Sequence, residues 1–160
     1  MAIAPLVGRA SRAVGCRVYP PAGPATPPAD LRIPEDLAAF YEICGGVDLY
    51  ANHDYALSIV GPNDLRSANI AILGEDYPGD ISSSWYTIGV TPDREYLSID
   101  LSARRNGRCY DSFHEVHGLV GSCPIIASSF TELLERLLES SGGRWYWLDP
   151  DFVDLGDAYD

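Results

Sequence analysis

Three strand-like segments follow one another closely in the middle of the chain. They are "WYTIGV" (85–90), "EYLSIDL" (95–101) and "GRCYDSF" (107–113), and only "TPDR" and "SARRN" separate them. Parallel neighbours need a long crossover connection, whereas antiparallel neighbours can be joined by a short turn. The spacing therefore predicts an antiparallel meander, around which the rest of the chain has to fold.

The stretch before the meander, "RIPEDLAAFYEICGG" (32–46), predicts a short helix. Pro34 suits its first turn, where a backbone N–H would have no helical partner. One face is apolar at helical spacing and consists of Leu37, Phe40, Tyr41 and Cys44. Gly45 and Gly46 are expected to end the helix in the left-handed conformation that glycine adopts readily.

The stretch after the meander, "ASSFTELLERLLES" (127–140), predicts a second helix with a marked start. Ser129 and Glu132 have the spacing of a capping box, in which each side chain accepts a hydrogen bond from the other residue's backbone N–H. The apolar stripe consists of Phe130, Leu133, Leu134, Leu137 and Leu138. Gly142 and Gly143 are expected to stop the helix.

The remaining segments carry weaker signals. "YALSIV" (55–60) predicts a half-buried strand, and the turn at 61–64 can cap a helix that runs to about Leu73. Residues 74–84 read as loop, and residues 1–32, with their "PPAGPATPP" run, as an extended lead-in. Helices that bracket a run of strands indicate a single α+β domain.

The charge of the chain limits its partners. The sequence has 23 acidic and 11 basic residues, a formal net charge of -12, and every basic residue is arginine. Such a surface disfavours direct binding of nucleic acid or membrane lipid and would steer a basic protein toward it. Solubility alone is an equally good explanation of the charge. The lack of lysine excludes Schiff-base chemistry by the protein's own side chains.

The cysteines and the N-terminal sequence bear on the compartment. Cys16, Cys44, Cys109 and Cys123 are far apart, show no metal-binding spacing and are expected to be buried, reduced thiols. The first residues lack the order of a signal peptide, and no apolar run approaches the ~18 residues of a membrane span. A cytoplasmic protein is expected.

Motifs that could carry chemistry are incomplete. "HEVH" (114–117) lacks the spacing that would put His114 and His117 on one helical face for a metal. "DPDFVDLGD" resembles a calcium loop only partly, because Asp154 stands where glycine belongs and Asp160 where glutamate belongs. No nucleophile elbow or phosphate-binding glycine loop occurs. The sequence therefore predicts no catalytic, metal or cofactor site and no enzyme.

Two loop regions combine acidic and aromatic residues, a composition that suits the binding of a basic protein. The candidate partner-binding residues are Tyr50, His53, Asp54, Glu75, Asp76, Tyr77, Asp80 and Trp85. The alternative is that the aromatic rings belong to the core and that the acids are simply solvated.

The order of these segments resembles the SUKH superfamily, the Smi/Knr-type immunity proteins. The resemblance rests on "IPEDLAAFYEICGG", "GPNDL", "YTIGV", "EYLSIDL", "GRCYDSF" and "ASSFTELLERLL", and covers about residues 30–148. It implies a mixed, mainly antiparallel, curved sheet of about four to six strands flanked by helices. The Arg/Pro-rich segment 1–29 and the acidic tail 149–160 lie outside the matched pattern.

The resemblance also implies a function. Many members bind and neutralise a cognate toxin, often a nuclease or a nucleic-acid deaminase, and catalysis is not typical of the family. The leading hypothesis is a non-enzymatic immunity protein whose acidic, aromatic surface occludes a basic cleft of such a toxin. Alternatives are a regulatory or scaffolding module, or a small-ligand protein that uses His114 and His117.

Overall fold

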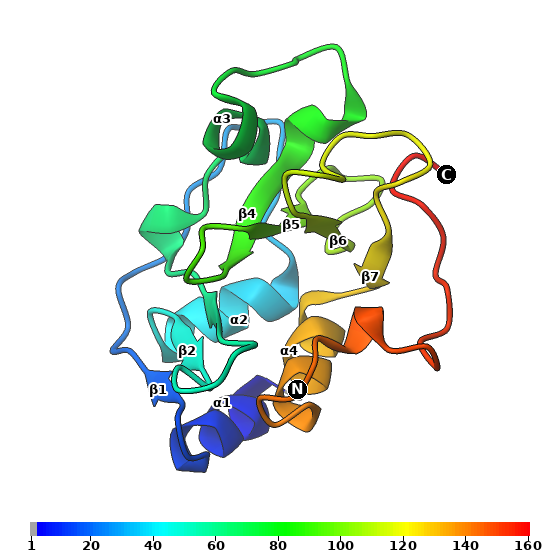
Figure 1. The fold of residues 1–160 in the computed structure, drawn as a ribbon. Helices are drawn as coiled ribbons and strands as arrows, with labels where there is room; N and C mark the ends of the chain where they lie inside the picture. The colour runs from blue at the N-terminus through cyan, green and yellow to red at the C-terminus, as the bar shows by residue number, and fades with distance from the viewer. Residues whose placement is uncertain (1–2) are drawn as a thin grey trace.

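Residues 3–160 are described by a computed structural model, in which seven strands form one antiparallel sheet in chain order, β1 to β7 (Figure 1). The strands are β1 (Arg17–Val18), β2 (Val47–Leu49), β3 (Leu57–Ile59), β4 (Trp85–Val90), β5 (Tyr96–Asp100), β6 (Cys109–Ser112) and β7 (Ile125–Ala127). The helices are α1 (Ile3–Arg12), α2 (Glu35–Ile43), α3 (Ala68–Leu73) and α4 (Phe130–Glu139). The predicted α+β class is confirmed. The seven strands exceed the expected number, and every described strand pair is antiparallel, so the sheet is not mixed.

The predicted meander forms the middle of this sheet. β4 pairs with β5 from Trp85 opposite Asp100 to Val90 opposite Tyr96, and β5 pairs in turn with β6. A bulge between Thr87 and Gly89 shifts the register within β4. Side chains alternate between the two faces along each strand. Those on one face pack into the main core, and those on the other face contact a second layer of the molecule.

α2 begins at the expected place but ends differently from the prediction. Cys44 is extended at its C-terminal end, with φ -151°, so no left-handed residue caps the helix. Gly46 has φ +118°, and a Cβ atom at Gly45 would collide with the carbonyl oxygen of Pro20. The glycine pair therefore allows the segment around Pro20 to approach, and Gly45 N–H donates to Tyr19 O over 3.0 Å.

α4 carries the predicted cap in a shifted form. The Ser129 hydroxyl accepts a hydrogen bond from Glu132 N–H over 3.1 Å, as expected. The Glu132 carboxylate, however, accepts from Ser128 N–H at 3.3 Å instead of from Ser129. Thr131 is also held, since its N–H and hydroxyl both donate to Asp36 of α2 over 2.8 Å. This contact ties the N-terminal turns of α2 and α4 together.

The predicted extended conformation of the first 32 residues is wrong for residues 3–12. They form α1, whose Ile3, Leu6, Val7 and Ala10 are buried and which packs against α2 and α4. These four residues have the i, i+3, i+4, i+7 spacing of a helix, a signal that Pro5 and Gly8 obscure. Residues 20–28 do lack regular structure, and residues 1–2 lie outside the described part.

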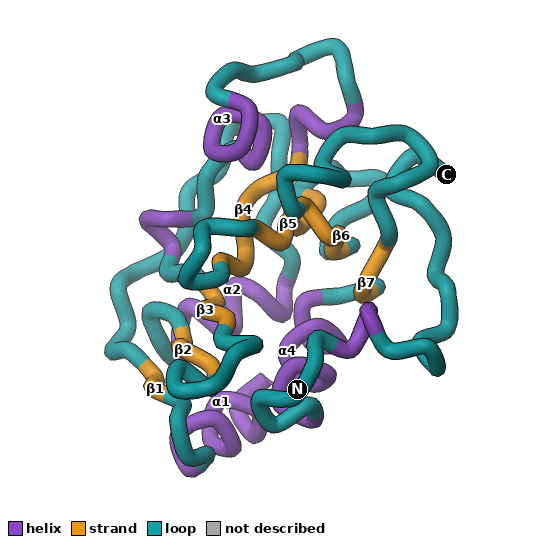
Figure 2. The backbone as a smooth tube through the Cα atoms, in the orientation of Figure 1, coloured by secondary structure: helices purple, strands orange, loops and turns teal. Residues whose placement is uncertain are grey.

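The two faces of the sheet differ in what covers them. α1, α2 and α4 pack on one face around the main core, which includes Phe40, Leu97 and Phe130. α3 lies on the other face, over a smaller core that contains Trp85 and Tyr110 (Figure 1). Much of that second layer consists of loops, as Figure 2 shows. Over β1 to β3, the same face carries the polar side chains of Asp48 and Ser58, which are only partly buried.

Candidate functional site

The eight predicted binding residues fall into two separate groups. Tyr50, His53 and Asp54 belong to the connection between β2 and β3, whereas the residues from Glu75 to Trp85 follow α3. Figure 1 places these two connections at opposite ends of the molecule, so the fold does not bring the eight residues together.

Two of the eight are core residues, which corrects their assignment as exposed anchors. Trp85 is 0% exposed, because its ring is enclosed by Tyr110 at 4.5 Å and Tyr159 at 5.6 Å between centroids. Tyr50 is 7% exposed, and its hydroxyl donates to Leu138 O over 2.9 Å. Neither ring is presented to a partner. His53, Asp54, Glu75, Asp76 and Tyr77 are exposed and Asp80 is half-buried, and a binding role for these six stays a prediction.

The loop 74–84 is joined to two other segments in one surface. The hydroxyl of Tyr159 donates to Asp80 Oδ2 at 2.8 Å and to Gly118 O at 3.3 Å. The Asp157 carboxylate accepts hydrogen bonds from the backbone N–H groups of Gly121, at 3.1 Å, and Cys123, at 2.8 Å. Side chains of the C-terminal segment therefore fasten the loops 74–84 and 114–123 to each other.

We call the surface formed by residues 74–84, 114–123 and 153–160 the acidic end. Its acidic residues are Glu75, Asp76, Asp80, Glu115, Asp154, Asp157 and Asp160. No arginine occurs in these ranges, and Arg108 touches the surface from beneath, where it donates to Ala158 O over 2.9 Å. Exposed apolar side chains lie among the acids, namely Tyr77, Leu119, Val120, Val153 and Leu155. Apolar contact area within a strongly negative rim is typical of surfaces that bind proteins.

A chain of buried hydrogen bonds supports the acidic end from below. His117 Nε2 lies 2.7 Å from Asn69 Oδ1, and Asn69 Nδ2 donates to Ser82 Oγ over 3.0 Å. Ser82 Oγ then donates to Asp80 Oδ2 over 2.5 Å. Because an amide oxygen can only accept, Nε2 carries the proton of neutral His117. We refer to these four residues as the buried relay; it links α3 to both loops.

Burial controls the protonation of this relay. Desolvation lowers the pKa of His117 to about 4, although Asp80 opposes the shift, so the imidazole is neutral at pH 7. Its Nδ1 is buried without a hydrogen-bond partner in the described residues. Burial would raise the pKa of Asp80, but hydrogen bonds from Ser82 and Tyr159 outweigh it, so the net pKa lies below the ordinary value. The relay is thus a rigid support that holds one negative charge at the surface.

The two histidines of "HEVH" do not form a joint site. His114 is exposed, and its Nδ1 lies 2.8 Å from Glu95 Oε1, a hydrogen bond that raises the pKa of His114. His117 is 4% exposed and points into the relay. Across residues 3–160, no group of three or more histidine, cysteine or acidic side chains is arranged to hold a metal ion. The carboxylates of the tail instead accept backbone hydrogen bonds, as Asp154 does from Gly156.

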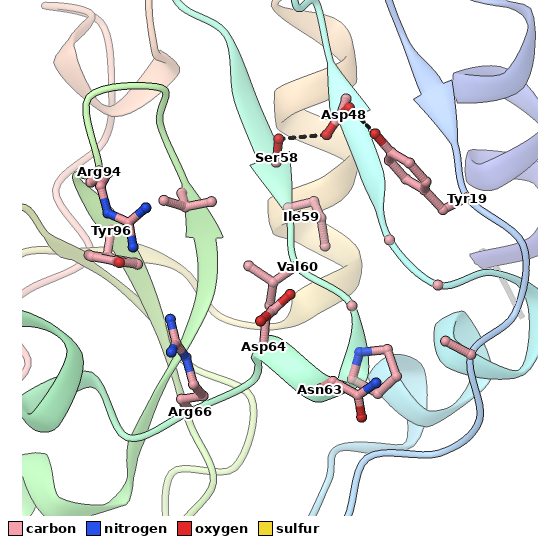
Figure 3. Close-up of a pocket in the computed structure, with 16 residues that line it drawn as sticks. Tyr19, Asp48, Ser58, Ile59, Val60, Asn63, Asp64, Arg66, Arg94 and Tyr96 are labelled. Carbon is pink, nitrogen blue, oxygen red and sulfur yellow. Dashed lines mark hydrogen bonds between the residues drawn. The ribbon is translucent and has the colours of Figure 1, made fainter.

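A cavity of about 460 Å³ opens on the part of the second face that α3 leaves uncovered (Figure 3). Tyr19, Asp48 and Ser58 form one wall, in which Asp48 accepts hydrogen bonds from the Tyr19 hydroxyl at 2.5 Å and the Ser58 hydroxyl at 2.7 Å. The hydrogen bond to Asp48 raises the pKa of Tyr19. Arg66 and Arg94 lie on the opposite side, next to Tyr96. Sequence reasoning missed this site, since its residues come from four separate segments.

The four cysteines, at positions 16, 44, 109 and 123, are all free thiols. Three of them are buried, as expected, whereas Cys16 is only partly buried. Desolvation raises the pKa of the Cys123 thiol to about 12, so this sulfur is not a thiolate at pH 7. None of the helices between residues 3 and 160 has the length and apolar character needed to cross a membrane.

Comparison with known proteins identifies the family. The SMI1/KNR4 family (SUKH-1) matches residues 29–136 of this chain. Immunity protein YokJ of Bacillus subtilis (strain 168) is 46% identical over 160 residues, which cover 100% of this chain and 97% of that protein. No solved structure gives a significant match. The chain belongs to the SMI1/KNR4 family (SUKH-1), and the resemblance seen in its segment order is confirmed.

Proposed function

We propose that this protein is an immunity protein that binds and neutralises a cognate toxin without catalysis. The observation that carries the proposal is the 46% identity with Immunity protein YokJ, which extends over the whole chain. Similarity over the full length includes the segments 3–28 and 137–160, which lie outside the SMI1/KNR4 match. α1 and the tail are therefore shared with a protein that is named for immunity.

The acidic end supplies a mechanism for this function. A nuclease or a nucleic-acid deaminase has to hold phosphates, so its substrate cleft is positive. A surface with seven carboxylates and no arginine can occupy such a cleft in place of the nucleic acid. Tyr77, Leu119 and Val120 provide apolar contact that excludes water around the ion pairs. Because the charges of the two surfaces would be complementary, we propose that the toxin is a nuclease or a deaminase.

Hydrogen bonds that already exist in the free protein prepare the surface for binding. A loop that becomes ordered only in a complex loses conformational entropy, which weakens the affinity. Asp80 and Asp157 are already fixed by hydrogen bonds with Tyr159, Gly121 and Cys123 in the free protein. The site of action is proposed to be the cytoplasm, because four free thiols suit a reducing compartment.

The test begins with the neighbouring genes: a toxin domain that they encode is co-expressed with this protein, and binding of the purified pair is then measured. We expect wild-type protein to protect cells and to bind with an association rate that falls at least tenfold between about 50 mM and about 500 mM NaCl. The paired substitution Glu75→Gln with Asp76→Asn should slow association, whereas the control Glu135→Gln with Glu139→Gln on α4 should not. Absence of a complex and of protection would refute the function and favour a scaffolding role.

A further inference from the structure

Arg66 and Arg94 share two adjoining cavities. Both line the cavity of about 460 Å³ and a neighbouring one of about 480 Å³, and Tyr96 lines both as well. Figure 3 shows the two side chains extending toward Tyr96 from opposite directions, Arg66 from below and Arg94 from above. Two guanidinium groups therefore border one concave region of the surface.

No acid neutralises these two arginines. Within residues 3–160, neither guanidinium lies within 4.0 Å of a carboxylate, and neither side chain takes part in a hydrogen bond. Asp48, across the cavity, accepts from Tyr19 and Ser58 instead. Glu95, next to Arg94 in sequence, is engaged by His114 at 2.8 Å. Most arginines in the described residues also lack an acidic partner, so the distinguishing feature of these two is that they border one concave region, where a single anionic group can reach both.

The backbone at Arg94 is also unusual. Arg94 has φ +64°, in the left-handed region, where glycine is favoured and other side chains are uncommon. Its N–H donates to Thr91 O over 2.9 Å, and Thr91 N–H donates to Glu95 O over 2.9 Å, which closes the turn between β4 and β5. Glycine would suit this turn with less strain. An arginine held there, and unpaired, points to a role for its side chain beyond the turn.

These arginines are connected to the acidic end through α3. Ile70 and Ala71 of α3 line the second cavity together with Arg66 and Arg94. Ile70 is 55% and Leu73 47% exposed, and Glu75 follows directly after the helix. The six residues of α3 extend roughly 9 Å at 1.5 Å per residue. One continuous surface thus passes from positive through apolar to negative.

We propose that Arg66 and Arg94 form a carboxylate-binding pocket that accepts an acidic side chain of the toxin. The inference rests on the proposed function, and it adds a fixed orientation of the bound toxin on this protein. The toxin carboxylate lies at the arginine pocket, an apolar toxin residue covers Ile70 and Leu73, and basic toxin residues face Glu75 and Asp76. A basic protein without such a carboxylate could still contact Glu75 and Asp76, but it would leave the arginine pocket empty. The pocket therefore distinguishes the cognate toxin from other basic proteins.

The surroundings favour a single carboxylate over a polyanion. Asp48 and Asp64 line the same cavity, and the acidic end lies beyond α3. A nucleic acid or a polyphosphate that reached Arg66 and Arg94 would also meet these negative charges. One acidic side chain among basic neighbours avoids that repulsion. The planar guanidinium fork matches the two oxygens of a carboxylate.

The test uses the toxin domain from the previous section. Arg66→Gln with Arg94→Gln should weaken wild-type affinity roughly tenfold or more, whereas the exposed pair Arg104→Gln with Arg144→Gln should change it less than about twofold. Arg94→Gly should weaken binding while its Tm stays at or above that of wild type, which a purely structural role would not allow. In double-mutant cycles, one toxin Glu→Gln or Asp→Asn variant should couple to the arginine pair.

Three results overturn the inference. In the first, the double variant binds as tightly as wild type. In the second, it binds more weakly but no toxin carboxylate couples to Arg66 or Arg94, and an RNA oligonucleotide competes with the toxin at the pocket instead. Each of these leaves the proposed function standing, because the wild-type complex forms. In the third, wild type forms no complex at all, and the proposed function falls together with the inference.

Discussion

Acidification should destabilise the protein through the buried side chain of His117. The pKa of this group is 6.5 in an unfolded chain and about 4 in the fold, where desolvation disfavours the imidazolium. Between these values the unfolded chain binds a proton that the folded chain does not, so stability from this group is complete above pH 6.5 and is lost as the pH falls. Thermodynamic linkage between proton binding and folding then lowers the free energy of unfolding by about 2 kcal/mol at pH 5 and about 3 kcal/mol at pH 4.

The measurement compares wild type with His117→Gln. Glutamine can donate to Asn69 from its amide nitrogen and does not titrate, so the relay is kept and only the proton equilibrium is removed. Urea unfolding followed by tryptophan fluorescence at several pH values gives the free energy of unfolding of both proteins. The difference between the two should change by about 3 kcal/mol in favour of the variant between pH 7 and pH 4.

A control separates His117 from other histidines. Exposed His114→Gln should retain the acid-induced loss, because the pKa of His114 is raised by Glu95 and changes stability in the opposite direction. If wild type and His117→Gln lost stability in parallel from pH 7 to pH 4, the buried neutral imidazole would not be the cause. Desolvation of His117 would then not account for the sensitivity to acid.

Two further substitutions probe the helices. Ile3→Ala should lower the free energy of unfolding by about 2–3 kcal/mol, because Ile3 is fully buried in α1, and an effect below about 0.5 kcal/mol in urea unfolding would show that α1 is not part of the core. Ser129→Ala should cost about 1 kcal/mol through loss of the cap on Glu132 N–H, whereas Ser128→Ala, which leaves that cap intact, should cost less; equal losses in thermal unfolding would contradict the cap assignment.

Local signals made part of the fold predictable. The β4 to β6 meander follows from short connections, and α4 from a serine cap followed by a regular apolar stripe. β1, β2 and β7 have two or three residues each, too few for a periodic pattern, and exist because neighbouring strands supply their hydrogen bonds. The sequence did not predict α1, because the proline-rich composition of residues 1–32 indicated an extended segment and obscured the helical spacing of its apolar residues.

The candidate site was less predictable for a physical reason. Exposure of an aromatic ring depends on what lies above it, and Trp85 is covered by Tyr159, which is 74 positions away in the sequence. Composition predicts Glu75, Asp76 and Tyr77 as binding residues, but which segment lies beside their loop depends on how the tail returns to the sheet, where Tyr159 donates to Asp80. Arg66 and Arg94 carry no local signal, because only the fold brings both to the same two cavities.

The return of the tail to Cys123 has a consequence for protein synthesis. Strands paired in chain order can assemble one after another as the polypeptide emerges, since each new strand meets the one made just before it. The acidic end cannot follow this order, because Ala158 N–H donates to Cys123 O and Tyr159 holds Asp80, a residue made much earlier. A nascent chain can therefore complete its sheet before the surface that we propose as the toxin-binding site has formed. That surface is complete only when residues 157–159 have left the ribosome.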